Sequence, residues 1–312
     1  MIGSIVFATE QGLGYLAKDF HDHGLLDKVL IYPHSSRESH TEWFPNSRLY
    51  SKSEIPWLLE GLDTLLLFET AFDWSIIPEA QKRGITVVLM PMHECTPYPL
   101  PYQPDVILAP SLIEEECYPG SRGVVVPTEQ TWKLRERAKV FVHNGGNLGI
   151  GGRNGTKEVL KAMEYVKSPI QLIVRTQCGD FTSKDPRITI EKSVSRETLY
   201  RVGDVFLFPE KFNGLSLPIQ EAFASGMAIM CGARKPMTSW LPNEIMIPVS
   251  SYMKDGIARM IDVAVYDPKD IAWAIDKWYD QDISMFSVAG KKWAEQYTWD
   301  NLRNNFSLLC AK

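Results

Sequence analysis

Short apolar runs recur along the first half of the chain and alternate with segments of helical periodicity. Runs of this length predict buried strands, and they occupy residues 2–9, 28–32, 64–68, 86–90 and 106–109. After the first run, residues 15–23 carry apolar side chains at the spacing of an amphipathic helix. Buried strands that alternate with helices favour a parallel sheet covered on both faces. The first half therefore predicts one α/β domain.

The pattern breaks at residues 127–137, PTEQTWKLRER, and this polar segment predicts a linker between two domains. The pattern then restarts. Strand patterns lie at 140–143, 171–175, 188–191, 205–209 and 228–231, and helix patterns lie at 156–166, at 217–226 and from 267 onward. We therefore predict an α/β fold with two Rossmann-like domains, over residues 1–130 and 138–294.

Composition narrows the class of protein. The 312 residues exceed the roughly 100–200 of a typical domain, which agrees with two domains. No apolar run approaches the roughly 20 residues of a membrane span, and the amino terminus lacks a basic segment and a cleavage site, so we expect a cytoplasmic protein. The net charge of −5 provides no overall attraction for nucleic acid. Five isolated cysteines without a CxxC spacing indicate neither a zinc site nor a disulfide scaffold.

The most informative segment is residues 193–231. A buried strand pattern ends in a loop that contains Asn213 and Gly214, Pro218 suits the first turn of a helix, and Glu221 follows one turn later. A strand, a glycine-containing loop and a helix amino terminus make an anion site, because free backbone N–H groups point outward there. A carboxylate inside such a helix can accept hydrogen bonds from sugar hydroxyls. An ordinary strand–loop–helix unit with a surface glutamate is the alternative.

The order of these pieces resembles the carboxy-terminal domain of the retaining GT-B glycosyltransferases, in particular glycosyltransferase family 4. The matching segments are VSRE at 194–197, GDVF at 203–206, NGLSLP at 213–218 and EAFASG at 221–226. The resemblance implies two Rossmann-like domains with parallel sheets that face a central cleft. It also implies transfer of a hexosyl or pentosyl group from a nucleoside diphosphate sugar, with a UDP-sugar favoured, to an acceptor hydroxyl with retention.

The resemblance also implies the donor-binding residues of the second domain. The paired glutamates of the family fall at Asn213 and Glu221, and Glu221 is expected to hold the ribose hydroxyls. Further donor contacts are expected at Val194, Gly214, Leu215 and Ser216. Asn213 carries no charge to stabilise a cationic anomeric centre, so this position indicates either an altered sugar preference or a catalytically degenerate binding protein.

A glycine-rich stretch, HNGGNLGIGGRNGT at 143–156, takes the place of the family's first phosphate loop. Glycines such as Gly152 let the backbone approach phosphates closely, and a cation neutralises the leaving group. The family lysine aligns with Asn154, so Arg153 or Lys157 must replace it, and Arg175 is a second candidate cation. The DxD motif at 280–282 follows no buried strand, so we expect no metal and no cofactor.

In the first half, Gly12 and Gly14 follow the first strand, and the resemblance places this loop near the donor phosphates or the acceptor. A lone GxG also admits an NAD-dependent oxidoreductase, although it lacks the third glycine and the downstream acid. His93 ends a strand at the carboxyl edge of the sheet, where α/β sites form, and its position resembles that of the family's active-site histidine. Glu69 and Glu94 are weaker acceptor-side candidates.

The acceptor is inferred from the compact form of the chain. NGLSLPIQEAFASGM resembles small glycosyltransferases encoded by bacteriophages, which implies 5-hydroxymethylated pyrimidines in DNA as acceptors in the host cytoplasm. Arg37 and Lys52 are possible phosphate contacts, whereas the acidic net charge favours the alternative, a cell-surface glycan or lipid. YTW at 297–299 resembles the family's closing motif and implies a terminal helix, 295–312, that returns to the first domain. The oligomeric state is left open.

Overall fold

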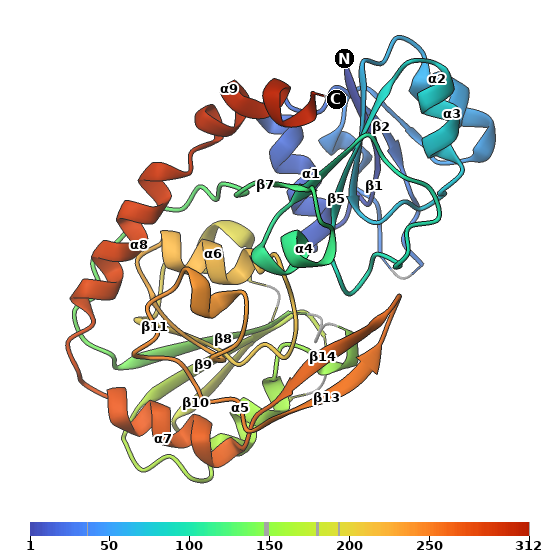
Figure 1. Cartoon of the computed structure of the whole chain (residues 1–312). Helices are drawn as coiled ribbons and strands as arrows, with labels where there is room; N and C mark the ends of the chain where they lie inside the picture. Colours follow the sequence, from blue (N-terminus) through green and yellow to red (C-terminus); the bar gives the residue numbers. More distant parts are fainter. Residues whose placement is uncertain (36, 147–149, 179–180, 193, 312) are drawn as a thin grey trace. The chain divides into compact units, whose positions relative to one another are not determined.

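The computed structural model describes residues 1–35, 37–146, 150–178, 181–192 and 194–311. The chain forms two compact units, and Figure 1 labels most of their helices and strands. The first unit comprises Met1–Val126, Gly256–Ile261 and Trp299–Lys312, and the second comprises Pro127–Asp255 and Asp262–Thr298. Each unit is therefore assembled from segments that are distant in the sequence.

Within the described residues, the first unit contains a seven-stranded sheet in the order β3-β2-β1-β4-β5-β6-β7, and all its neighbouring strands are parallel. The strands are β1 (Ile2–Val6), β2 (Lys28–Ile31), β3 (Ser47–Leu49), β4 (Thr64–Glu69), β5 (Thr86–Pro91), β6 (Val106–Ala109) and β7 (Arg122–Gly123). The helices are α1 (Gly12–Asp22), α2 (Ile55–Leu59), α3 (Ile76–Lys82), α4 (Leu112–Cys117) and α9 (Trp299–Cys310). Apolar side chains on both faces of β4 are buried, which explains its continuous apolar run.

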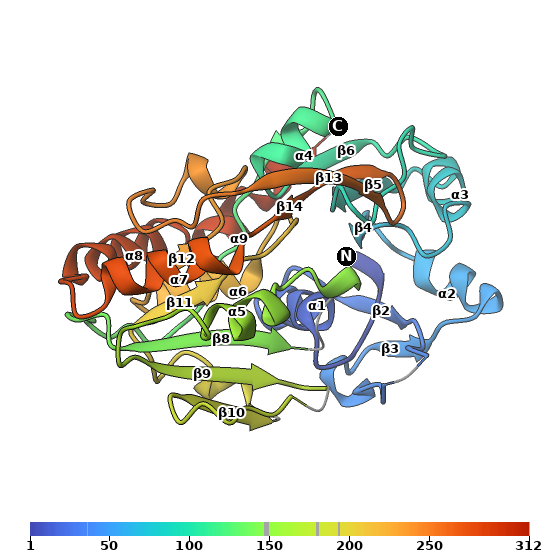
Figure 2. The same ribbon diagram turned by 90° about the horizontal axis from the view of Figure 1, so that it is seen from below.

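The second unit contains a five-stranded parallel sheet, counted over its described residues, in the order β10-β9-β8-β11-β12. The strands are β8 (Val140–Gly146), β9 (Gln171–Thr176), β10 (Ile188–Lys192), β11 (Val205–Phe208) and β12 (Ala228–Cys231). The helices are α5 (Thr156–Ala162), α6 (Leu217–Ala224), α7 (Pro268–Trp278) and α8 (Ser284–Gln296). Figure 2 shows β8, β9 and β10 side by side. The prediction of an α/β fold with parallel sheets is confirmed for both units.

The polar segment 127–137 packs against the second unit and is not a free linker. Trp132 Nε1 donates to the carbonyl of Ser287 at 3.0 Å, and Lys133 N donates to the carbonyl of Ser225 at 3.0 Å. The guanidinium of Arg135, a residue only 3% exposed, donates to the carbonyl of Tyr200 at 3.0 Å. These polar groups of the segment therefore find hydrogen-bond partners within the second unit.

The sequence analysis did not predict β13 (Ser251–Gly256) and β14 (Met260–Val265), which pair in a two-stranded sheet. All six residues of β13 are exposed, so this strand has no buried face and no period-two alternation. The predicted helix at 156–166 is shorter in the structure, where α5 ends at Ala162. The last stretch, predicted as helical without internal bounds, forms three helices, α7, α8 and α9.

The carboxy-terminal helix α9 completes the core of the first unit. Trp299 and Phe306 contact Phe20 of α1 edge-on, with ring centroids 5.4 and 6.2 Å apart. Arg303 Nε donates to the carbonyl of His23 at 2.8 Å. Among the described residues, no helix combines the length and the apolar character that crossing a bilayer requires.

Candidate active site

Most of the polar residues that the sequence analysis singled out in the second unit lie at the carboxyl ends of its strands. Arg175 lies in β9, Val194 follows β10, and the loop with Asn213 follows β11. Because carboxyl ends of neighbouring parallel strands share one edge of the sheet, these residues gather at the edge where α/β proteins bind ligands. The glycine loop after β8 reaches the same edge, although its residues 147–149 lie outside the described part of the chain.

Helix α6 begins where the sequence analysis placed it. Pro218 stands in its first turn, where a missing backbone N–H costs nothing, and Ser216 is its N-cap without a side-chain cap hydrogen bond. Gly214, Leu215 and Ser216 are all buried before the helix starts. The helix therefore presents an amino terminus next to the loop that carries Asn213.

Glu221 is 6% exposed and both of its carboxylate oxygens are engaged. Oε1 accepts from Arg196 Nε at 3.2 Å and from Arg196 Nη2 at 2.9 Å, and Oε2 accepts from the Tyr200 hydroxyl at 3.0 Å. Asn144 Nδ2 donates to the same hydroxyl at 3.3 Å. Burial, followed by the charge of Glu221, raises the pKa of the Tyr200 hydroxyl well above its usual value. The carboxylate is therefore not an exposed surface glutamate.

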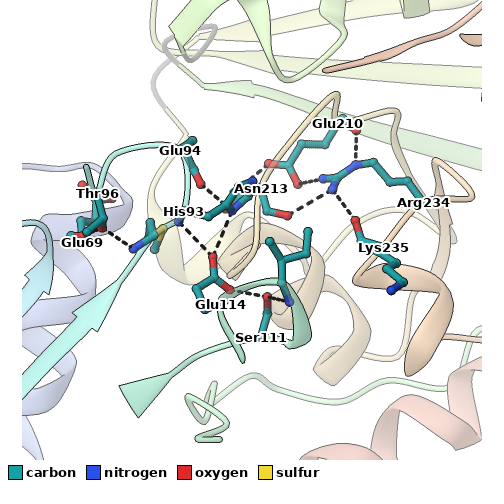
Figure 3. Close-up of polar contacts among 12 residues, drawn as sticks. Glu69, His93, Glu94, Thr96, Ser111, Glu114, Glu210, Asn213, Arg234 and Lys235 are labelled. Carbon is teal, nitrogen blue, oxygen red and sulfur yellow. Dashed lines mark hydrogen bonds and ion pairs between the residues drawn. The ribbon is translucent and has the colours of Figure 1, made fainter. Parts of the chain in front are cut away.

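Asn213 is 3% exposed and lies beside a second buried carboxylate (Figure 3). Its Nδ2 donates to Glu210 Oε1 at 2.9 Å, and Glu210 Oε2 lies 3.4 Å from Arg234 Nη2. Burial raises the pKa of Glu210, whereas the charges of Arg234 and Arg153 and the hydrogen bond from Asn213 lower it. An acid three residues away thus stands next to the amide that replaces the family's first glutamate.

The three candidate cations differ in their surroundings. Arg153 is half-buried, its carbonyl accepts from Lys211 N at 2.8 Å, and its charge lowers the pKa of Glu210. Lys157 is exposed, on the first turn of α5. Arg175 is 5% exposed rather than solvated, its Nε donates to Glu191 Oε2 at 2.8 Å, and its Nη1 donates to the carbonyl of Leu199. The charge of Arg153 thus acts beside Asn213, and the role of each cation toward a phosphate stays a prediction.

Glycine is required at one position of the phosphate-loop segment by close packing. A Cβ on Gly155 would lie 2.5 Å from the carbonyl oxygen of Pro209, and this residue has a φ of +74°. Gly152 also has a positive φ, of +67°, but its surroundings are open. Gly155 therefore serves the packing of the loop against the residue that follows β11, and the role of Gly152 toward a phosphate stays a prediction.

His143 is fully buried and forms hydrogen bonds both to the sheet and to α5. Its two ring nitrogens lie 2.8 Å from the Leu207 carbonyl and 2.8 Å from the Thr156 hydroxyl. Burial lowers its pKa from 6.5 to about 4, so the ring is neutral near pH 7. Because both nitrogens are occupied inside the protein, His143 acts as a structural residue.

In the first unit, Gly14 is explained by packing alone. A Cβ on Gly14 would lie 2.0 Å from the carbonyl oxygen of Thr9, whereas a Cβ on Gly12 would meet nothing within 4 Å. Helix α1 can therefore approach the end of β1 only with glycine at residue 14. The roles of both glycines toward a donor stay predictions.

His93 follows β5 and is 6% exposed, between two glutamates that are fully buried (Figure 3). Its Nδ1 lies 3.1 Å from Glu94 Oε2 and 3.1 Å from Glu114 Oε1. Ser111 Oγ donates to the other oxygen of Glu114, which fixes that carboxylate. His93, Glu94 and Glu114 each offer one ligand atom, and these three atoms lie within 4.8 Å of one another. Such a group could also hold a metal ion. The sequence analysis expected no metal, and that expectation stays a prediction.

Sequence reasoning missed the partners that fix these side chains. Arg234, Glu114 and Glu210 were not among the candidate residues. Arg234 binds a carboxylate 24 residues earlier, and Glu114 binds a histidine 21 residues earlier. No motif spacing connects residues so far apart in the chain, so only the fold reveals these pairs.

No protein-family model and no curated protein matches the chain by sequence. Several solved structures are similar to it in fold. A glycosyltransferase from Rickettsia africae ESF-5 is 10% identical with a TM-score of 0.64, and the match covers 99% of this chain and 97% of that one. Sucrose-phosphate synthase from Thermosynechococcus elongatus is 13% identical with a TM-score of 0.62, over 99% and 97% of the two chains.

A third similar structure is the catalytic domain of starch synthase IV from Arabidopsis thaliana, bound to ADP and acarbose. It is 8% identical with a TM-score of 0.60, and the match covers 99% of this chain and 98% of that one. The finer resemblance, to family 4 and to compact phage enzymes, stays a prediction. The two parallel α/β units and these likenesses over nearly the whole chain show that the protein has the GT-B fold of two-domain glycosyltransferases.

Proposed function

We propose that the protein transfers a glycosyl group from a nucleoside diphosphate sugar to an acceptor hydroxyl, with retention at the anomeric carbon. The observation that carries the proposal is the buried Glu221, held by Arg196 and Tyr200 at the carboxyl edge of the second sheet. A carboxylate fixed there can accept hydrogen bonds from ribose hydroxyls. The GT-B fold agrees with this reaction, because it is the fold of the glycosyltransferases described above.

In the proposed reaction, the bond between the anomeric carbon and the diphosphate oxygen breaks and the acceptor oxygen forms a new bond to that carbon. The departing diphosphate gains charge, which Arg153 and the amino terminus of α6 are placed to stabilise by preorganised electrostatics. The proton of the acceptor hydroxyl passes to the leaving diphosphate, so no dedicated base is required. Val194, Gly214, Leu215 and Ser216 line the donor site in this proposal, and Lys157 is the alternative phosphate cation. His93 and Gly12 keep the roles that the resemblance implies.

We propose a UDP-sugar as the donor and no metal requirement. The DxD motif at 280–282 supports the second point, because it lies between α7 and α8 and Asp282 accepts a hydrogen bond from Ser284 N at 2.9 Å. Calorimetry with UDP, ADP and GDP and with their glucose conjugates tests the donor, and consumption of the bound conjugate tests the enzyme. Binding without turnover toward any acceptor would indicate the alternative, a catalytically degenerate binding protein.

For the acceptor, we propose hydroxymethylated pyrimidines in DNA as the first class to test. An aromatic cluster supports it: Tyr32 and Phe72 are stacked with centroids 4.6 Å apart, and Phe7 meets Phe72 edge-on at 4.8 Å. Half-buried rings of this kind stack on flipped bases, and also on the faces of sugar rings. Of the two suggested phosphate contacts, Lys52 pairs with Asp73 at 3.7 Å, and Arg37 donates to the carbonyl of Glu10.

The acceptor assay uses a labelled nucleotide sugar with DNA that contains 5-hydroxymethylcytosine, and unmodified DNA as the control. Label in the modified DNA only, with binding that weakens steeply as salt rises, supports the DNA acceptor. Label that enters a glycan or lipid acceptor and neither DNA refutes it and leaves the glycosyltransferase proposal standing.

A further inference from the structure

The turn between β13 and β14 belongs to the first unit, although most of each strand belongs to the second. Within the first unit, Ala258 N donates to the carbonyl of Glu94 at 3.2 Å, in the segment that follows β5. The carboxyl ends of the strands of a parallel sheet are where α/β proteins bind ligands. The turn therefore brings its next residue, Arg259, to that edge of the first sheet.

The guanidinium of Arg259 lies among neutral side chains. Its Cζ is 4.9 Å from the centre of the Tyr98 ring, and Tyr98 meets Tyr118 edge-on with ring centroids 6.2 Å apart. Burial raises the pKa of the Cys117 thiol and the pKa of the Tyr118 hydroxyl, and the charge of Arg259 lowers both. No carboxylate of the described residues forms an ion pair with Arg259. Its positive charge is therefore available to a ligand.

Two polar atoms of this group are buried and make no hydrogen bond of normal geometry to any described residue. They are Arg259 Nη1 and the hydroxyl oxygen of Tyr118. Tyr118 is only 3% exposed, so bulk water does not compensate for the missing partner. Native proteins rarely keep such atoms without a ligand or an ordered water. Both groups can donate, and one of them is permanently charged, so together they suit a negatively charged acceptor of hydrogen bonds.

The surroundings favour a ligand with a single negative charge. After burial and Arg259, the next influence on the pKa of Cys117 is the charge of Glu114, which raises it. This acid would repel a dianion, whereas a phosphodiester carries one charge, which Arg259 balances. Tyr98 is 59% exposed, so much of its ring is open to a stacking base. A cation beside an exposed aromatic ring is an arrangement that binds unpaired nucleotides.

We propose that Arg259 and Tyr118 bind one phosphodiester of a nucleic-acid acceptor whose neighbouring base is unpaired and stacks on Tyr98. The inference rests on the proposed function, because it deepens the proposal for the acceptor. It differs from the earlier suggestion of Arg37 and Lys52, whose side chains have partners within the protein. The three residues of the new site all belong to the first unit, at the carboxyl edge of its sheet.

Three probes of the full chain separate the charge, the base and the source of the phosphate. A short single-stranded oligothymidylate carries phosphodiesters and bases, its methylphosphonate counterpart has a neutral backbone, and glycerophosphoglycerol is a phosphodiester without a base. We expect fluorescence anisotropy to show binding of the oligothymidylate, and binding about tenfold or more weaker for the methylphosphonate form, which makes no charge-assisted hydrogen bond. Glycerophosphoglycerol should compete much less well than unlabelled oligothymidylate, because it offers nothing that stacks on Tyr98.

Two variants assign the binding to the residues. Arg259→Gln should weaken oligothymidylate binding by about ten- to a hundredfold and reduce the slope of log K against log salt by about 0.7, the share of one phosphate. Tyr118→Phe should weaken binding by about two- to tenfold without lowering the melting temperature, because the hydroxyl has no partner in the free protein to lose. Arg83→Gln removes an exposed arginine of the same unit, paired with Glu79, and as the matched control it should bind as the wild type does.

The outcomes that overturn the inference are distinct from a failure of the proposed function. The inference fails if oligothymidylate does not bind the wild type, or if it binds Arg259→Gln with the same affinity and salt slope. Equal competition by glycerophosphoglycerol would refute the nucleic-acid ligand. If Arg259→Gln does not fold, the methylphosphonate comparison and Tyr118→Phe decide. None of these results concerns the donor, so the proposed function is tested separately by the calorimetry with nucleotide sugars.

Discussion

Replacing Glu221 by glutamine keeps the shape of the side chain and removes the charge at the centre of the proposed donor site. In the wild type, Oε1 accepts two hydrogen bonds from Arg196, and Oε2 accepts one from Tyr200. Glutamine can accept at only one of these positions, and its NH2 must face a donor at the other. We therefore expect Glu221→Gln to lose at least one charge-assisted hydrogen bond.

The magnitude follows from the burial of the pair. Hydrogen bonds to charged groups contribute about 1.5–3 kcal/mol. The side chains of Glu221 and Arg196 are 8% and 22% exposed, so the arginine can turn partly toward water and the loss falls toward the lower end, about 2 kcal/mol. For a protein of this size that corresponds to a fall in melting temperature of about 4–8 °C. If ribose hydroxyls bind the same carboxylate, donor affinity falls by roughly tenfold as well.

Thermal unfolding and calorimetry with the nucleotide sugar measure the two effects separately. Arg196→Met and the double variant complete a mutant cycle, in which a coupling of about 1–2 kcal/mol between the two positions is expected. A folded Glu221→Gln protein with unchanged donor affinity would remove Glu221 from the donor site. An unchanged melting temperature as well would contradict the hydrogen-bond geometry itself.

Three further outcomes follow from the geometry. Gly14→Ala should lower the free energy of unfolding by about 1–3 kcal/mol in urea, because its Cβ would meet the Thr9 carbonyl. Gly12→Ala, whose Cβ would meet nothing within 4 Å, should leave that free energy nearly unchanged. Equal effects of the two substitutions would contradict the packing argument. Arg153→Ala should lower turnover strongly and the melting temperature only a little. Arg175→Ala should lower the melting temperature more than turnover, because it leaves Glu191 without its partner. Full turnover in Arg153→Ala, together with a folded but inactive Arg175→Ala, would assign the phosphate role to Arg175. Burial lowers the pKa of His143 from 6.5 to about 4, so the unfolded state takes up the proton first as pH falls. The free energy of unfolding of the wild type should therefore drop by about 3 kcal/mol between pH 6.5 and pH 4. A drop of the same size in a folded His143→Gln variant would show that another group titrates.

The elements with a buried face were predictable because burial leaves a pattern in the sequence. Strands β4 and β5 lie within a residue of their predicted bounds, since both faces of each are covered and only apolar side chains fit there. The exposed strand β13 leaves no such pattern and was missed. Local preference alone could not reveal it, because its pairing with β14 does not depend on a buried face.

Only the part of the candidate site whose residues are contiguous in the sequence was predictable. The loop and first turn of α6 follow from Asn213, Gly214 and Pro218 in order, because strand, turn and helix signals are local. The partner of Glu210 was not predictable, because Arg234 reaches the site from another loop, 24 residues later in the chain. The burial of Arg175, named above only as a second candidate cation, was likewise not predictable, because its partner, Glu191, lies on the neighbouring strand β10.

The position of α9 in the first unit has a consequence for how the protein is made. Phe20 of α1 packs against Trp299 and Phe306, so the ribosome must synthesise the chain as far as Phe306 before the first unit can close its core. At about 5–20 residues per second, translation of the intervening segment takes roughly ten seconds or more. During that time the apolar surface around Phe20 stays uncovered and is open to chaperones. A chain cut short before Trp299 should therefore harm the unit that was synthesised first and leave the later one able to fold.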